Sequence, residues 1–227
     1  MKNTVRVAIG AAMFVSSLCA TAYEAGDWIA RVGAATVAPN EDSDNIVIPT
    51  SPSTTLRGVD VDSNTQLGLV GAYMLSNNFG VELLAATPFE HDISVSGTNI
   101  DAGSTKHLPP TVVLQWYPRG GLSGWQPYLG AGINYTYFFD EDVDSDLSTA
   151  LGALIGATDA DLELDDSTGL ALQVGMDYPL NDRWAINIGV WYLDIETTAK
   201  IKTDVGNVKF DVDIDPWVYN IGIAYKF

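Results

Sequence analysis

The stretch Trp217-Val218-Tyr219-Asn220-Ile221-Gly222-Ile223-Ala224-Tyr225-Lys226-Phe227 alternates in side-chain character without a break. Large apolar or aromatic residues occupy the odd positions, and smaller or polar residues occupy the even ones. Because successive side chains of a strand point to opposite faces, the pattern predicts a β-strand with one apolar face. That face carries rings at both ends and aliphatic side chains between them.

Two kinds of sheet contain a strand of this type. A soluble antiparallel sheet buries one face against a core and exposes the other to water. A strand that faces lipid places its rings at the two membrane interfaces, as Trp217 and Tyr219 do at one end and Tyr225 and Phe227 at the other. A chain that ends on an aromatic residue also resembles the terminal signature of bacterial outer-membrane barrels. We therefore favour the membrane interpretation and expect the barrel-assembly machinery to recognise this strand through Phe227.

The first 22 residues are predicted to be a secretory signal peptide. Lys2 and Arg6 precede an apolar run that ends at Leu18, and Ala20-Thr21-Ala22 supplies the small residues of a cleavage site. The run is too short for an uncleaved anchor, and no stop-transfer flank follows it. The mature chain is predicted to form one barrel domain over residues 23–227, which is 227 − 22 = 205 residues.

Charge and cysteine content exclude several classes of function. Removal of the signal peptide takes away Lys2 and Arg6 but no acid, so 11 − 2 = 9 basic residues oppose 29 acidic ones. Such an acidic chain is a poor partner for nucleic acid. The single cysteine, Cys19, lies inside the signal peptide, so the mature chain has neither a disulfide nor thiol chemistry.

Alternation of the same kind predicts eight strands, and no later run approaches the ~20 apolar residues of a spanning helix. The expected strands are 26–37, 66–75, 79–89, 107–117, 128–139, 169–178, 184–195 and 217–227. Three short turns alternate with four long polar loops, of which the loop at 140–166 keeps a short stretch of helical spacing. The pattern is typical of an all-β, eight-stranded antiparallel transmembrane β-barrel with short periplasmic turns and long extracellular loops, in the outer membrane of a Gram-negative bacterium.

Motifs for catalysis, cofactors or metals are weak. Gly130-Ala131-Gly132-Ile133-Asn134 lies within a strand, where small residues lining a narrow barrel explain it better than a nucleotide loop. The aspartates at 140, 142, 144 and 146 begin like a calcium loop, but Ser145 and Leu151 stand where glycine and glutamate are needed. His91 and His107 are the only histidines and supply a transition-metal site poorly. We expect no enzyme activity, no cofactor and no metal site.

The inward-facing positions divide by height. Near the periplasmic end they are charged or polar and are predicted to pair into a closed floor, with Arg31, Glu82 and Lys226 in one buried cluster beside Gln115 and Asp177. Higher up they turn apolar, at Val70, Leu84, Phe138, Trp191, Leu193 and Val218. These residues could simply fill a small lumen. An apolar cup open to the outside also suits a hydrophobic ligand, because barrel lumens of this kind are usually polar.

Three prolines lie on one predicted seam between neighbouring strands. Pro88 is near the end of one strand, and Pro109 and Pro110 are near the start of the next. Proline has no N–H to donate, so all three remove hydrogen bonds at the same height. The seam is expected to open sideways into the membrane.

Four stretches together resemble the outer-membrane protein W (OmpW) family, which includes alkane-import proteins. They are Gly80–Phe89, His107–Thr111, Pro127–Thr136 and Val190–Ile195, and the match extends over essentially the whole mature chain. The resemblance implies an eight-stranded barrel whose hydrophobic channel admits small apolar molecules and releases them through the wall. The loops at 40–62 and 140–166 are longer and more acidic than is usual for the family, so loop-borne functions do not carry over.

The sequence thus predicts passive uptake of small hydrophobic molecules with lateral release into the membrane. The alternative is a structural or surface-interaction barrel, whose acidic loops bind divalent cations, lipopolysaccharide or another cell. The expected partners are outer-membrane lipids, lipopolysaccharide and small apolar solutes.

Overall fold

The computed structural model describes residues 22–47 and 55–227. The predicted signal peptide lies outside the described residues apart from Ala22. The elements are β1 (Trp28–Ala38), β2 (Asp42–Ser43), β3 (Ile46–Val47), β4 (Thr55–Leu56), β5 (Val59–Val61), β6 (Asn64–Met74), β7 (Phe79–Ala86), β8 (Phe89–Val95), β9 (Asp101–Leu108), β10 (Thr111–Trp116), β11 (Gln126–Val143), α1 (Ser145–Ile155), β12 (Ala160–Leu164), β13 (Ser167–Pro179), β14 (Trp184–Leu193), β15 (Glu196–Thr203), β16 (Gly206–Asp213) and β17 (Trp217–Lys226).

Eight of these strands close into an antiparallel barrel. Their order is β10-β7-β6-β1-β17-β14-β13-β11, and pairing of β10 with β11 completes the circle. The first and last strands pair over their full length, from Ile29 opposite Lys226 to Ala38 opposite Trp217. The eight-stranded transmembrane barrel predicted from the sequence is therefore confirmed, and its strands pair with one another around the whole wall, as a structure that spans a membrane requires.

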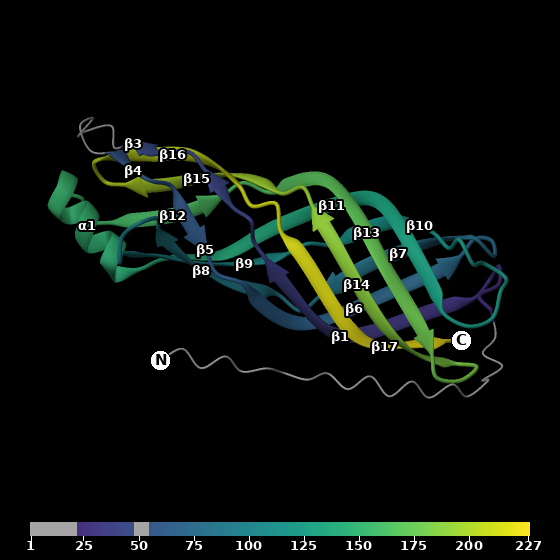
Figure 1. Cartoon of the computed structure of the whole chain (residues 1–227). Coiled ribbons are helices and arrows are strands. Elements are labelled where there is room, and N and C mark those ends of the chain that lie inside the picture. The colour runs from purple at the N-terminus through teal and green to yellow at the C-terminus, as the bar shows by residue number, and fades with distance from the viewer. Residues whose placement is uncertain (1–21, 48–54) are drawn as a thin grey trace, which may run out of the picture.

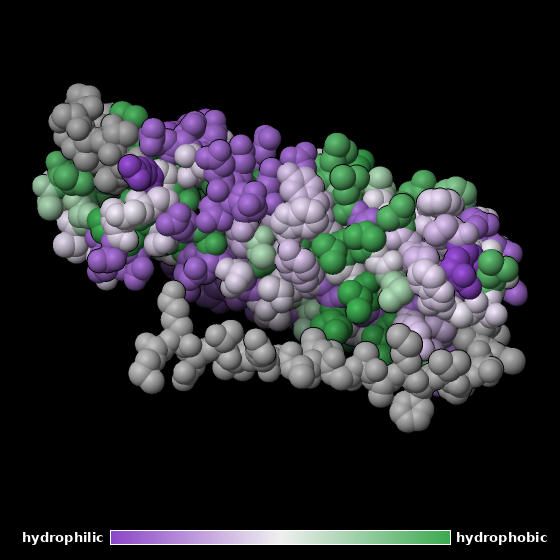
Figure 2. Space-filling view, viewed as in Figure 1, coloured by the Kyte–Doolittle hydropathy of each residue, from purple (hydrophilic) through white to green (hydrophobic). Residues whose placement is uncertain are grey.

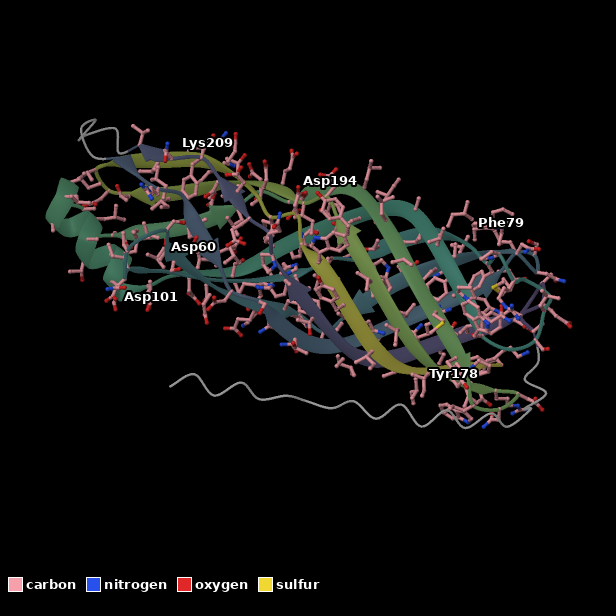
Figure 3. The ribbon with its side chains drawn as sticks, in the orientation of Figure 1. Asp60, Phe79, Asp101, Tyr178, Asp194 and Lys209 are labelled. Atoms are coloured by element: carbon pink, nitrogen blue, oxygen red, sulfur yellow. The ribbon has the colours of Figure 1, made fainter. Side chains whose placement is uncertain are left out.

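The two ends of the barrel differ in the way expected of an outer-membrane protein. Short turns and the C-terminus lie at one end, and the remaining elements extend the molecule from the other end (Figure 1). Short turns belong to the periplasmic side and long connections to the outside. In Figure 3, Phe79 and Tyr178 mark the periplasmic end, while Asp60, Asp101 and Lys209 belong to the extracellular extension.

The outer wall of the barrel is apolar. Figure 2 shows hydrophobic residues gathered over the middle of the barrel, whereas hydrophilic residues dominate the visible face of the extension. On β17 the odd residues Trp217, Tyr219, Ile221 and Ile223 are exposed, and the even residues Val218, Asn220 and Ala224 are buried. The alternation that predicted this strand therefore assigns its faces correctly.

The long connections are not irregular loops, and this part of the prediction was wrong. β8, β9 and the upper half of β11 continue the barrel wall outward, with β5 added at the edge of β8. A second sheet, β12-β15-β16-β2, stands opposite. Its strands bury Ala199, Ile201 and Phe210 and expose charged neighbours, so the period-2 signal was present in the sequence but was diluted by lysine and aspartate.

The stretch of helical spacing within 140–166 forms α1, in which Leu147 and Leu151 are buried. Asp144 caps its first turn by accepting a hydrogen bond from the backbone of Asp146, and Gly156 ends it with a φ of 76°. Among the helices in the described residues, none has the length and apolar character needed to cross a membrane.

The interior is built from three apolar clusters stacked along the barrel axis. The periplasmic cluster contains Ile29, Met74 and Tyr117, and the middle cluster contains Val70, Leu84, Trp191 and Leu193. The third cluster lies inside the extension and includes Ile93, Ile201, Phe210 and the buried face of α1. The apolar interior therefore continues well beyond the membrane.

Candidate functional site

The periplasmic floor is centred on one buried arginine. Arg31 of β1 is 1% exposed, and its guanidinium contacts Glu82 of β7 at 2.9 Å and Asp177 of β13 at 2.7 Å. Tyr117 accepts a further hydrogen bond from Arg31 at 2.9 Å. Since β1, β7 and β13 are not neighbours in the sheet, these contacts cross the lumen and close it.

Amide side chains satisfy the remaining carboxylate oxygens of the floor. Gln115 donates to Glu82 at 2.6 Å and Gln173 donates to its other oxygen at 2.7 Å. Asn187 donates to Asp177 at 2.7 Å, and Tyr23 donates to the same carboxylate at 2.8 Å. Full hydrogen bonding of this kind is what makes a buried ion pair tolerable.

Lys226 is not part of this cluster, so its predicted place beside Arg31 and Glu82 was wrong. It lies at the periplasmic rim, opposite Ile29 of β1, where its ammonium is 3.7 Å from Asp27 and donates to the carbonyl of Ala22. The two residues lie at different depths in the barrel. Arg31 is opposite Ala224, which is two residues further into the barrel than Lys226. At the rim, a lysine can keep its charged group near water.

Above the floor, apolar side chains fill the lumen. All six residues predicted to line an apolar cup belong to one buried cluster. Five of them do not border the cavity described below and pack with Val113 and Ala171, namely Val70, Leu84, Trp191, Leu193 and Val218. Trp191 is 1% exposed and lies over Gly189, where an added Cβ would come within 2.6 Å of the indole. We call this packed layer the plug.

The open space lies one level higher than the sequence suggested. An apolar cavity of about 70 Å³ is enclosed by the outer part of the barrel and the extension. Phe138 lines it, together with many residues that the sequence pattern does not indicate as facing inward, among them Val59, Ile93, Ile201 and Phe210. The sequence predicts that these residues lie in loops, where alternation does not mark an inward face.

The three prolines lie where the barrel wall is interrupted. β7 and β10 are paired up to Leu84 opposite Thr111, and pairing resumes with Phe89 of β8 opposite His107 of β9. Pro88, Pro109 and Pro110 fall between these two pairs. Each side of the interruption is hydrogen-bonded to its other neighbouring strand. The amide of Thr87 donates to the carbonyl of Leu67, and the carbonyl of Pro110 accepts from the amide of Tyr135.

This interruption adjoins the bottom of the cavity. His107 and Phe138 line the cavity, and their Cα atoms are partners across β9 and β11. Leu84, on the other side of the interruption, belongs to the plug. The structure therefore brings the prolines together between the plug and the cavity.

The two histidines meet at the same level. The Nε2 atoms of His91 and His107 are 2.9 Å apart, and the two rings are 3% and 5% exposed. The outward neighbours Glu90 and Lys106 face each other on the same strands, so this level lies above the lipid. Burial lowers the pKa of His107 to about 3, helped by the nearby His91, whose own pKa burial also lowers. Both histidines stand out in the sequence, but their spacing of 16 residues does not place them side by side.

The outer surface of the extension carries two acidic grooves. One is lined by Asp42, Asp44, Asp165, Asp166, Glu196, Asp211 and Asp213, and the other by Asp62, Asp92, Asp101, Asp142 and Asp144. Within the described ranges, side chains that could bind a metal do not converge in groups of three or more.

Comparison with known proteins supports the same architecture. The family model described as "OmpW family" matches residues 24–227. This chain belongs to the OmpW family. It is 46% identical to Outer membrane protein W of Vibrio cholerae over 232 residues, covering all of both chains. The crystal structure of OprG from Pseudomonas aeruginosa superposes with a TM-score of 0.81 at 46% identity, covering 92% of this chain and 99% of that one.

A more distant relative is the dibenzothiophene metabolism operon protein PahQ of Pseudomonas aeruginosa, 26% identical over 170 residues and 74% of each chain. The family assignment made from the sequence is confirmed, as is the outer-membrane location, since the OmpW relatives are outer-membrane barrel proteins.

Proposed function

We propose that this OmpW-family barrel takes up small hydrophobic molecules passively and releases them sideways into the outer membrane. The observation that carries the proposal is the position of the apolar cavity, which lies directly above the interrupted pairing between Leu84–Thr111 and Phe89–His107. The relative PahQ belongs to an operon for the metabolism of dibenzothiophene, an apolar compound, which agrees with this class of substrate.

The layers below the cavity favour a lateral exit over passage to the periplasm. An apolar solute gains ~25 cal/mol for each Å² removed from water, so it is stable in the cavity and in lipid. The plug blocks the axial path, and the Arg31–Glu82–Asp177 network beneath it offers no apolar surface. Movement between Pro88 and Pro109–Pro110 keeps the solute in apolar surroundings throughout.

The test is to restore the missing backbone donors. Changing Pro88, Pro109 and Pro110 together to valine allows the two edges to pair, and uptake of radiolabelled toluene by whole cells is expected to fall. The matched control changes Pro118, Pro127 and Pro179, three prolines at the periplasmic end, to valine. Equal uptake by the seam variant and the parent, at equal barrel abundance, rules out the lateral route.

The acidic grooves support a second candidate, a surface-interaction role through divalent cations and lipopolysaccharide. The groove that contains Asp42 and Asp213 gathers seven acidic residues around a space of about 600 Å³. Clustered carboxylates suit hard cations such as Ca²⁺. Binding of purified lipopolysaccharide that requires Ca²⁺, and that is lost when Asp42, Asp44 and Asp213 become asparagine, is the expected result for this role.

A further inference from the structure

The hydrogen bonds of the histidine pair fix where the protons of both rings lie. Nδ1 of His91 contacts the backbone carbonyl of Asp62, which can only accept. His91 therefore carries its proton on Nδ1, and a neutral imidazole then has a lone pair on Nε2. His107 must donate its Nε2 proton to that lone pair across 2.9 Å. This leaves Nδ1 of His107 as a bare acceptor.

That acceptor has no partner in the described part of the protein. Nδ1 of His107 is one of four buried side-chain atoms there without a hydrogen bond, and the other three belong to Gln126, Trp191 and Asn220. Of these four residues, His107 alone lines the cavity. Native proteins rarely leave a buried polar atom unpaired, so an unpaired atom on a residue that lines a cavity points to a ligand.

The hydroxyl groups of the cavity wall are already committed elsewhere. Thr105 donates to the carbonyl of Lys106, Thr136 donates to Asn134, and Thr197 donates to the carbonyl of Asp165. Each hydroxyl has one proton to give. The other lining residues are almost entirely apolar. The wall itself therefore supplies no donor to His107.

A metal ion is a poorer occupant of this position. The described residues bring no third histidine, cysteine or carboxylate to the pair, whereas zinc sites use three or four protein ligands. Nε2 of each ring is also occupied by the other ring.

From these contacts we propose that the cavity selects apolar molecules bearing one hydrogen-bond donor, namely alcohols and phenols, through Nδ1 of His107. The hydrocarbon part fills the apolar space while the hydroxyl group pairs the one unpaired atom of the wall. A ketone of the same shape offers only an acceptor and leaves two lone pairs facing each other. A hydrocarbon leaves His107 as it is. This inference deepens the proposed function by naming the preferred substrates.

Binding is tested on the full barrel in lipid nanodiscs with three ligands of matched shape, cyclohexanol, cyclohexanone and cyclohexane. Ring nitrogens of histidine are labelled with ¹⁵N and followed by NMR, with empty nanodiscs to subtract partition into lipid. One net hydrogen bond corresponds to a preference of about fivefold. Cyclohexanol is therefore expected to bind about fivefold more tightly than the other two and to shift Nδ1 of His107 alone.

Two variants test whether selectivity comes from the Nδ1 lone pair of His107 or only from the presence of a polar side chain. His107→Phe keeps an aromatic ring between Phe89 and Phe138, which flank His107 at centroid distances of 5.5 and 5.8 Å, and the Nδ1 shift and the preference over cyclohexane should both be lost. His91→Phe removes the group that fixes the tautomer of His107. His107 can then donate as well as accept, so cyclohexanone should bind about as well as cyclohexanol.

Equal binding of the three ligands to the parent barrel, or unchanged selectivity in His91→Phe, overturns the inference. If neither variant folds, the Nδ1 shift in the parent barrel decides alone: a shift with cyclohexanol but not with cyclohexanone supports the inference, and its absence overturns it. None of these outcomes depends on transport. The proline variants can therefore rule out lateral release without affecting the selectivity for alcohols, and the binding experiment can rule out the selectivity without affecting lateral release.

Discussion

Arg31 and Asp177 bind each other across the lumen from strands that are not neighbours in the wall, with Nη2 and Oδ2 at 2.7 Å and Nε 3.2 Å from each carboxylate oxygen. The planar guanidinium reaches Glu82 and Tyr117 as well. One side chain thus ties β1, β7 and β13 together, and the floor behaves as a single unit.

Glu82→Leu is expected to weaken the barrel by roughly 3–5 kcal/mol, because it leaves Arg31 with half of its compensating charge and removes the carboxylate to which the amides of Gln115 and Gln173 donate. The measurement is the temperature at which the compact, SDS-resistant band converts to the unfolded one. Glu90→Leu is the matched control, since Glu90 is exposed on β8. A similar loss in both variants would show that the effect is one of charge number and not of the floor.

Gly189→Ala is expected to disturb the plug. The added Cβ would come within 2.6 Å of the Trp191 ring, which is fully enclosed and cannot move without displacing neighbours. Overpacking of this kind costs about 1–3 kcal/mol. Gly71→Ala adds the same methyl group where nothing lies within 4 Å, and it should be neutral. Urea unfolding in vesicles and tryptophan fluorescence measure the two effects.

Asp213 and Asp204 should respond to pH with opposite signs. Burial, together with the carboxylates of Asp215, Asp42, Asp211 and Asp44, raises the pKa of Asp213. The side-chain and backbone hydrogen bonds from Thr158 lower the pKa of Asp204. A raised folded-state pKa means that ionised Asp213 opposes folding at neutral pH, and that this penalty disappears as pH falls through its folded pKa. Ionised Asp204 stabilises the fold at neutral pH, and this is lost as pH falls through its folded pKa.

Asp213→Asn should therefore increase amide-exchange protection of the β15–β16 hairpin at pH 7, whereas Asp204→Asn should decrease it. The difference for Asp213→Asn should shrink as the pH falls towards 4, because the pKa of Asp213 is raised, whereas the difference for Asp204→Asn should persist to pH 4 and shrink only below it, because the pKa of Asp204 is lowered. Protection that changes in the same direction in both variants contradicts the assignment of the two pKa shifts.

The sequence was sufficient for the barrel because each spanning strand contacts lipid on one face and a filled lumen on the other, which enforces a strict period of two. The sequence also indicated the periplasmic floor, because charged residues that face inward at the same height can pair only with one another. Lys226 was misplaced because parity gives the direction of a side chain but not whether its charge can reach water. The extension was missed because its outer face contacts water, where Lys200 and Lys202 pair with Asp165 and Glu163 and mask the apolar alternation.

The histidine pair could not have been found from strand parity alone. His91 lies opposite Thr105, and His107 lies opposite Phe89, so the two rings meet only on a diagonal across β8 and β9. That diagonal depends on the register above the prolines, where the sequence predicts a loop between a strand that ends at Phe89 and one that begins at His107. The position of Pro88 relative to Pro109 was the available signal, because it fixes which residues can pair on either side of the interruption.

Leu84→Asp is expected to reduce uptake of an apolar tracer, because Leu84 is the last residue of β7 that pairs with β10 below the interruption and is buried in the plug beneath the cavity. An ionised carboxylate there must keep water beside it, and an apolar solute leaving the cavity would have to displace that water. Leu84→Met keeps the position apolar at similar volume and should import like the parent. Toluene uptake is compared at equal amounts of SDS-resistant barrel, so that loss of folding is not counted as loss of transport.

Trp191→Asp places a charge in the same layer from β14 and should also reduce uptake of the tracer. If folded Leu84→Asp takes up toluene as well as the parent does, solutes do not pass Leu84 when they leave the cavity. The exit would then have to lie higher in the wall, between β8 and β9.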